Sequence, residues 1–283
     1  MNEAISVIMP AFNSQDYIVR AVKSVLSQTY QNFELIIISD DLFDYKQFLE
    51  SKGIINKRIK YFNTGKYKTS PSFARNICLS LVKNNIVAVL DSDDTFIPEK
   101  LQLLLPKVID YGVATCALNY RKPDETLITT IGDDANQNIL TADTFPFVNF
   151  GGNSMIVLDI EKIPIKFCEI YPVMEDLVFV MSCFDYVEEI YHHSKPLHNY
   201  YFSSTSLSNN QNTNNLFIDT KKEMIKQIDL SLFPVKNAIA QKSTKQFLEI
   251  SIDCETKFSK LKQKNKEAAF IPFLKETLKS YVS

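Results

Sequence analysis

The chain of 283 residues has no tryptophan, six glycines and only three histidines. No GxGxxG pattern follows its first predicted strand, so the dinucleotide-binding fingerprint is missing. A Gly-rich, Lys-containing phosphate loop is missing too, which argues against a nucleotidyltransferase. The five cysteines are scattered and form no CxxC pair. That pattern excludes an obvious zinc site or disulfide framework and favours reduced thiols in a cytoplasmic protein.

Long apolar runs are also absent. No stretch approaches the roughly 20 residues needed to cross a bilayer, and the N-terminus lacks the pattern of a signal peptide. A formal charge of −2 argues against nucleic acid as the main partner. With 45% hydrophobic residues, the chain can bury a large core. We therefore expect a cytoplasmic globular protein.

The first hundred residues alternate between strand and helix patterns, which predicts an α/β fold with a parallel sheet and right-handed crossovers. Short apolar runs predict strands over 5–9, 33–38, 58–62 and 86–90. Helices are predicted after Asn13 or Ser14, over 43–52, and from Ser70-Pro71, a capping hydroxyl followed by proline at the first position.

The pattern is less regular further along the chain. A helix is expected over 98–111, with Pro106 kinking or breaking it. Strands are expected over 113–118 and 154–158, with loops over 119–150. An acidic pair, Glu175-Asp176, precedes an apolar run that is typical of a helix. Residues 203–215 are rich in Ser, Asn and Thr, which indicates a loop or linker.

Residues 216–283 form a Lys-rich tail with helical patterning over 223–230, 236–252 and 270–281. Lysines outnumber acidic residues there by 13 to 8. Such a tail could be a basic surface that meets the inner face of the membrane, or a contact with a partner such as a second copy of the chain. Because the charges are interspersed, we favour a solvated helical element that packs on the rest of the protein.

Three carboxylates crowd into the segment Asp91-Ser92-Asp93-Asp94, directly after the predicted strand 86–90. The carboxyl end of a strand in an open α/β sheet is where ligands bind. Crowded like charges are unfavourable unless a positive group lies between them, and a divalent cation with oxygen ligands is the simplest candidate. Alternatively, these residues serve only as turn and helix-capping residues.

Several motifs in order resemble family-2 inverting glycosyltransferases. They are Ile5-Ser6-Val7-Ile8-Met9-Pro10-Ala11-Phe12-Asn13, Ser24-Val25-Leu26-Ser27-Gln28-Thr29-Tyr30, residues 33–41, Ala74-Arg75-Asn76, residues 90–94 and Pro98-Glu99-Lys100-Leu101. The resemblance implies a GT-A fold, with a mixed, mostly parallel central sheet flanked by helices. It also implies a catalytic domain over 1–215, divided near 105 into donor and acceptor halves. The resemblance does not extend over the Lys-rich tail, residues 216–283, which we expect to be a helical extension.

The resemblance further implies a nucleotide-sugar donor, most often a UDP-sugar, with Mn²⁺ or Mg²⁺. Phe12 would pack against the base and Asp40 would accept the uracil N3–H, with Asp41 as the alternative. Arg75 would reach the diphosphate or the carboxylate cluster. Asp93 and Asp91 would hold the metal, and Asp91 could also contact the ribose. The implied nucleotide site comprises Pro10, Ala11, Phe12, Asn13, Asp40, Arg75, Asp91 and Ser92.

The same resemblance assigns Asp176 as the general base for the acceptor hydroxyl, supported by Glu175. The alternative is an acidic helix N-terminus stabilised by the helix dipole. Donor sugar or acceptor would lie near Gly151, Gly152, Asn153 and Asp94, the last also orienting its loop. The family's late aromatic-Arg-x-His motif is missing, and His198 could replace it with a metal or phosphate contact.

The sequence therefore predicts an inverting transferase that adds one sugar to a glycan or lipid-linked glycan in surface polysaccharide synthesis. Two alternatives remain: a non-catalytic protein that binds nucleotide sugars, or a nucleotidyltransferase.

Overall fold

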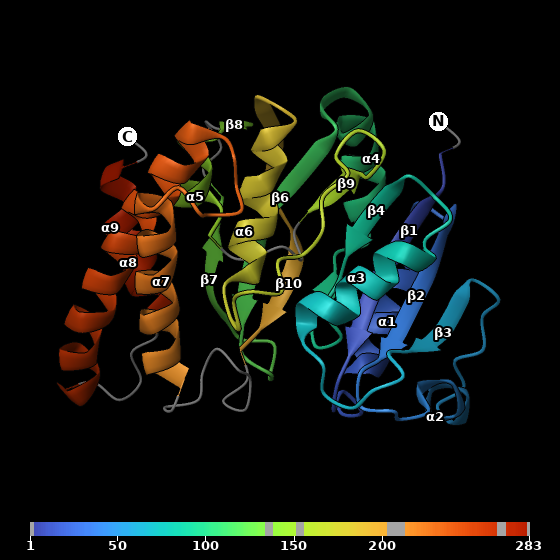
Figure 1. The fold of residues 1–283 in the computed structure, drawn as a ribbon. Helices are drawn as coiled ribbons and strands as arrows, with labels where there is room; N and C mark the ends of the chain where they lie inside the picture. Colours follow the sequence, from blue (N-terminus) through green and yellow to red (C-terminus); the bar gives the residue numbers. More distant parts are fainter. Residues whose placement is uncertain (1–2, 134–137, 151–155, 203–212, 265–269, 282–283) are drawn as a thin grey trace.

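The computed structural model describes residues 3–133, 138–150, 156–202, 213–264 and 270–281, and Figure 1 shows its fold. The described strands form one sheet in the order β3-β2-β1-β4-β9-β6-β10-β5, with β7 beside β6 and β8 beside β10. Pairs among β1–β4 are parallel, whereas β9 is antiparallel to both of its neighbours. The predicted mixed α/β architecture is confirmed.

Residues 5–89 alternate between strands and helices, as their sequence pattern predicts. The elements are β1 (Ile5–Ala11), α1 (Ile18–Leu26), β2 (Phe33–Ser39), α2 (Tyr45–Ser51), β3 (Ile59–Asn63), α3 (Pro71–Leu81) and β4 (Ile86–Val89). Ser70 caps α3 by accepting a hydrogen bond from Phe73 N–H at 3.1 Å. Val7 and Met9 face a core with α1, whereas Ile8 faces the core on the other side, because successive strand residues alternate.

The next part of the chain completes the sheet. Its elements are β5 (Thr95–Phe96), α4 (Lys100–Tyr111), β6 (Val113–Arg121), β7 (Leu127–Ile131), β8 (Ile139–Thr141), α5 (Phe145–Val148), β9 (Val157–Asp159), α6 (Glu175–Ser182), a 3₁₀ turn η2 (Cys183–Asp185) and β10 (Glu189–Tyr201). Pro106 does not end α4, because the burial of Leu101, Leu104, Leu105 and Val108 holds that helix on the sheet.

The expectation of loops over 119–150 was wrong. Strand β6 continues to Arg121, and β7, β8 and α5 follow within that range. Thr129 and Thr130 of β7 are half-buried, so this edge strand shows no clean alternation of apolar and polar residues.

The C-terminal helices are α7 (Thr213–Asp229), α8 (Ala238–Lys264) and α9 (Phe270–Leu278), followed by the turn η3 (Lys279–Tyr281). They stand together at one side of the sheet, at the left of Figure 1. Met224, Phe247, Leu248 and Leu274 are buried in the same core as α3 and α6. The tail is therefore a packing element of this fold. None of the described helices combines the length and apolar character needed to span a bilayer.

Candidate active site

The carboxyl ends of β1, β2 and β4 meet at one edge of the sheet, because these strands run parallel. This edge carries Phe12 after β1, Asp40 and Asp41 after β2, and residues 91–94 after β4. The residues that the sequence singled out after these three strands thus lie at a common edge.

Arg75 joins this edge to α6. The Arg75 guanidinium donates to Asp91 Oδ1 at 2.7 Å and to Glu175 Oε1 at 2.9 Å. Only 5% of Arg75 is exposed, and the two carboxylates raise the pKa of its guanidinium although burial opposes this. A planar fork with several donors can serve two carboxylates at once. The structure thus brings together three predicted site residues that are up to 100 positions apart.

Asp176 lies beside this bridge, in the first turn of α6. The residue before the acidic pair, Met174, has a left-handed backbone with φ of 64°. Such a conformation is unfavourable for a residue with a side chain and is often found at functional sites. Burial and the neighbouring Glu175 raise the pKa of Asp176 to about 7, against the opposing effects of Leu177 N–H and Arg75. A carboxylate of this kind suits general-base chemistry near neutral pH.

Asp91 and Asp93 are the residues that the sequence predicts as ligands of Mg²⁺ or Mn²⁺. Burial and the charge of Asp91 raise the pKa of Asp93 to about 6, which indicates crowded negative charge that a divalent cation would relieve. Among the described residues, no three His, Cys, Asp or Glu side chains are arranged to hold a metal alone. Mg²⁺ commonly uses one or two carboxylates together with substrate phosphates. The two aspartates fit a cation shared with a nucleoside diphosphate.

Asp40 and Phe12, the residues predicted to contact the nucleobase, both have partners within the protein. Asp40 accepts hydrogen bonds from Thr64 Oγ1 at 3.0 Å and from Thr69 Oγ1 at 2.6 Å, so a uracil N3–H would share this carboxylate with them. Phe12 is half-buried, and its ring centroid lies 5.7 Å from that of Tyr67. Tyr67 also borders a cavity of about 320 Å³ beside the N-terminal end of α3. Sequence reasoning missed Tyr67, which lies in a loop without a recognisable motif.

Asp41, the alternative to Asp40, has other partners. Burial acts to raise its pKa, but hydrogen bonds from Asn13 N–H, Tyr45 Oη, Phe43 N–H and Ser39 Oγ hold the pKa below its ordinary value. The Asn13 N–H to Asp41 Oδ2 distance is 2.7 Å. Asp41 thus fastens the segment after β1 to the end of β2.

The remaining predicted nucleotide contacts can be placed. Ala11 is buried and Pro10 is half-buried in β1, whereas Asn13 is exposed. Ser92 Oγ lies 2.7 Å from Ser14 Oγ, which ties the carboxylate segment to the start of the chain's first helical turn. Gly151, Gly152 and Asn153 lie outside the described residues.

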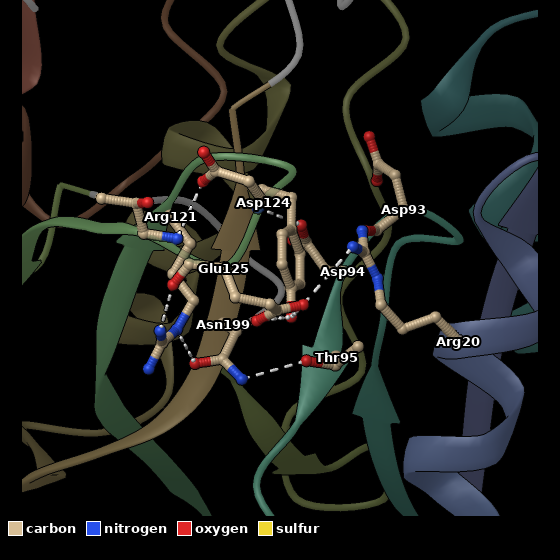
Figure 2. A network of polar contacts seen from close by, with 10 residues as sticks. Arg20, Asp93, Asp94, Thr95, Arg121, Asp124, Glu125 and Asn199 are labelled. Atoms are coloured by element: carbon tan, nitrogen blue, oxygen red, sulfur yellow. Dashed lines mark hydrogen bonds and ion pairs between the residues drawn. The ribbon is translucent and has the colours of Figure 1, made fainter.

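Arg20 contacts the carboxylate segment from α1, as Figure 2 shows. Its guanidinium donates to the Asp93 carbonyl oxygen at 2.7 Å and stacks 3.3 Å from the centroid of the Tyr201 ring. Tyr201 Oη in turn donates to Glu125 at 2.9 Å. Sequence reasoning missed this network, because α1, the β6–β7 turn and the end of β10 supply one residue each.

His198 is fully buried, which contradicts the predicted direct contact of its ring with a metal or phosphate. Its Nε2 lies 2.9 Å from Asp94 Oδ2, and its Nδ1 lies 3.4 Å from Lys100 Nζ. Asp94 itself is 1% exposed and also accepts from Tyr201 N–H at 3.0 Å. Asp94 is thus held by partners on β10 and offers little surface to a sugar.

Together, the sheet topology and the carboxylates at its edge define an α/β protein with an acidic candidate site at the carboxyl ends of its parallel strands. Comparison with known proteins gives the family. The model of "Glycosyl transferase family 2" matches residues 6–156, more than half of the chain, and the protein belongs to that family.

Two curated relatives illustrate the match. An uncharacterized glycosyltransferase of Rickettsia conorii is 36% identical over 121 residues, covering 43% of this chain and 20% of the relative. The Escherichia coli protein WfgD, a UDP-Glc:alpha-D-GlcNAc-diphosphoundecaprenol beta-1,3-glucosyltransferase, is 34% identical over 116 residues, covering 41% and 45%. The matched segment thus spans less than half of either relative.

Solved structures support the fold over a longer range. TarS residues 1–349 of S. aureus in complex with UDP-GlcNAc superposes with a TM-score of 0.59 at 16% identity, covering 89% of this chain and 72% of that one. The complex of the same fragment with UDP gives a TM-score of 0.57 at 18% identity, covering 87% and 70%. At this identity the likeness establishes the fold.

Proposed function

We propose that the protein transfers a sugar from a nucleotide sugar, most simply a UDP-sugar, to a hydroxyl of a glycan or glycolipid acceptor, with inversion at the anomeric carbon. The observation that carries this proposal is the Arg75 bridge between Asp91 and Glu175. It links the carboxylates that would serve the diphosphate with the acidic pair that would serve the acceptor. UDP-containing structures of the same fold and the UDP-Glc-dependent relative support the choice of donor.

In this proposal the two groups of carboxylates have different roles. Asp176 takes the proton of the acceptor hydroxyl while the oxygen of that hydroxyl attacks the anomeric carbon. The bond between that carbon and the diphosphate oxygen breaks, and its electron pair leaves with the nucleoside diphosphate. Asp91 and Asp93 would hold Mn²⁺ or Mg²⁺, which supplies Lewis-acid stabilisation of the leaving diphosphate. Arg75 would hold Asp91, on the side of the leaving diphosphate, and Glu175, on the side of the acceptor, at fixed positions.

Calorimetric titration with UDP, with and without Mn²⁺, tests the donor half. We expect UDP to bind more tightly with Mn²⁺, and this gain to disappear in Asp93→Ala. The exposed Asp110→Ala, on α4, serves as a matched control and should behave like the wild type. If wild-type protein binds neither UDP nor GDP, the nucleotide assignment is wrong. Binding without transfer to any acceptor hydroxyl would instead favour a non-catalytic nucleotide-sugar-binding protein.

A further inference from the structure

Three buried ionisable side chains form a row of contacts that begins at the end of the carboxylate segment, residues 91–94. Asp94, His198 and Lys100 have exposed fractions of 1%, 0% and 0%. His198 Nε2 lies 2.9 Å from Asp94 Oδ2, and Lys100 Nζ lies 3.4 Å from His198 Nδ1. The Lys100 ammonium also lies 3.9 Å from the centroid of the Phe96 ring. Removing ionisable groups from water is unfavourable, and apolar side chains would fill the same space at lower cost.

The chemistry of Lys100 determines how the histidine is protonated. An ammonium group has three donors and no acceptor, so His198 Nδ1 must accept. The hydrogen of the neutral ring is then on Nε2, which donates to Asp94 Oδ2. Burial and the nearby Lys100 both lower the pKa of His198, which agrees with a neutral ring. Burial lowers the pKa of Lys100 to about 8, which leaves it mainly charged at neutral pH.

Asp94 transmits this arrangement to the surface of the site. Its second oxygen accepts from Tyr201 N–H at 3.0 Å, so both carboxylate oxygens have a donor. Its own N–H donates to the Asp91 carbonyl at 3.1 Å and closes the turn that contains Asp91 and Asp93. Because Asp94 closes this turn, holding Asp94 in place also limits the orientations of the Asp91 and Asp93 side chains.

We propose that His198, oriented by Lys100, is a positioning residue for the carboxylates of Asp91 and Asp93. It acts through Asp94, and it touches neither the donor nor the metal. This inference rests on the proposed function, because the use of the two carboxylates as cation ligands belongs to that proposal. Groups that hydrogen-bond a metal ligand directly typically change metal affinity by about 10- to 100-fold when they are removed, and because His198 acts one residue further out, we expect the lower end of that range.

Nitrogen NMR of the full chain labelled at histidine tests the first step without any variant or ligand. We expect His198 to show a protonated Nε2 and an unprotonated Nδ1. A proton on Nδ1 would overturn the proposal, because Lys100 could not then donate to the ring. This result does not depend on whether the protein binds a nucleotide.

Mn²⁺ binding tests the second step, measured by the electron paramagnetic resonance signal of free Mn²⁺ in the presence of UDP. His198→Leu is expected to raise the Mn²⁺ dissociation constant by about tenfold or more. His198→Gln, whose amide can still donate to Asp94, should restore most of the affinity. His192→Leu is the matched control, because His192 is equally buried on β10 but bonds Thr115 and Gly132 away from the carboxylates.

The outcomes separate the proposals. Wild-type affinity in a folded His198→Leu, equal losses in His192→Leu, or no recovery in His198→Gln would overturn the positioning role. If His198→Leu does not fold, His198→Gln and Lys100→Met decide, and Lys100→Met must lose affinity for the proposal to stand. A wild-type chain that binds no Mn²⁺ with UDP overturns the proposed donor site, and the positioning role with it, whatever tautomer His198 shows.

Discussion

At the scale of single residues, Asp176 is set apart by its surroundings. It shares the first turn of α6 with Glu175, which Arg75 neutralises, whereas Asp176 itself has only Leu177 N–H as a recorded hydrogen-bond donor among the described residues. Burial therefore acts on Asp176 with little compensation, and its pKa rises to about 7. The proposed base is thus the member of the acidic pair that is not the ion-pair partner of Arg75.

Asp176→Asn should separate binding from chemistry. We expect transfer to fall by about 10²- to 10⁴-fold, the range for loss of a general base, while UDP affinity stays unchanged. The variant should also melt at a higher temperature than the wild type at pH 8, because a carboxyl whose folded pKa is raised loses stability as pH rises from its unfolded pKa through about 7. Transfer at the wild-type rate would show that Asp176 is not the base.

The same pKa predicts the acid side of the pH–rate profile. Asp176 can accept a proton only when it is ionised, so the rate of transfer at saturating donor should rise with pH and reach half its maximum near 7. An ordinary aspartate would place that midpoint near 4. Steady-state rates between pH 5 and 9 measure it, and UDP affinity over the same range shows whether donor binding follows a different curve. A flat profile from pH 5 upward would contradict the assignment.

At the scale of elements, Arg75 ties α3 to both the end of β4 and the start of α6. Arg75→Met should lower the free energy of unfolding by about 2 kcal/mol, somewhat less than for a fully buried ion pair, because it leaves two partly buried carboxylates without their cation. Urea unfolding measures this change. Arg58→Met is a suitable control, since Arg58 is half-buried over the Phe33 ring and its recorded hydrogen bonds go to Gln31 and Asn56 rather than to carboxylates. Equal losses in both variants would contradict a specific role for the bridge.

The elements differ in how well the sequence predicts them. Continuous apolar runs such as Leu35-Ile36-Ile37-Ile38 predict buried parallel strands directly, and Ser70-Pro71 marks the start of α3. The long strand β10 was missed, because its apolar residues are interrupted by charged ones and its register with β6 shifts around Pro196. A pattern of period two is lost across such irregularities.

The candidate site shows the same limit. Motifs placed the carboxylates at strand and helix ends, because those positions depend on local sequence. They did not show that Arg75 would meet Glu175, or that His198 would lie beneath Asp94, since 100 and 104 positions separate these pairs. Contacts of that range depend on how the sheet is ordered, and no local pattern of residues encodes that order.

At the scale of the whole molecule, the C-terminal helices are part of the fold. Phe247 of α8 is 4% exposed and lies against Phe147 of α5, with ring centroids 6.5 Å apart. Phe247→Ala should therefore cost about 3–5 kcal/mol of stability in urea unfolding. Gln246→Ala, an exposed neighbour on the same helix, should cost little. Equal, small effects would indicate that the tail is only loosely attached.

Strand β9 joins the two parts of the sheet. It is hydrogen-bonded to β4 on one side and to β6 on the other. Opening a gap between β4 and β6 would break backbone hydrogen bonds in the middle of the sheet. Within the described residues, the strands on either side of β9 are therefore expected to move as one unit. Under the proposed function, donor and acceptor would then be accommodated by side chains and by connections above the sheet edge, rather than by closure of one half on the other.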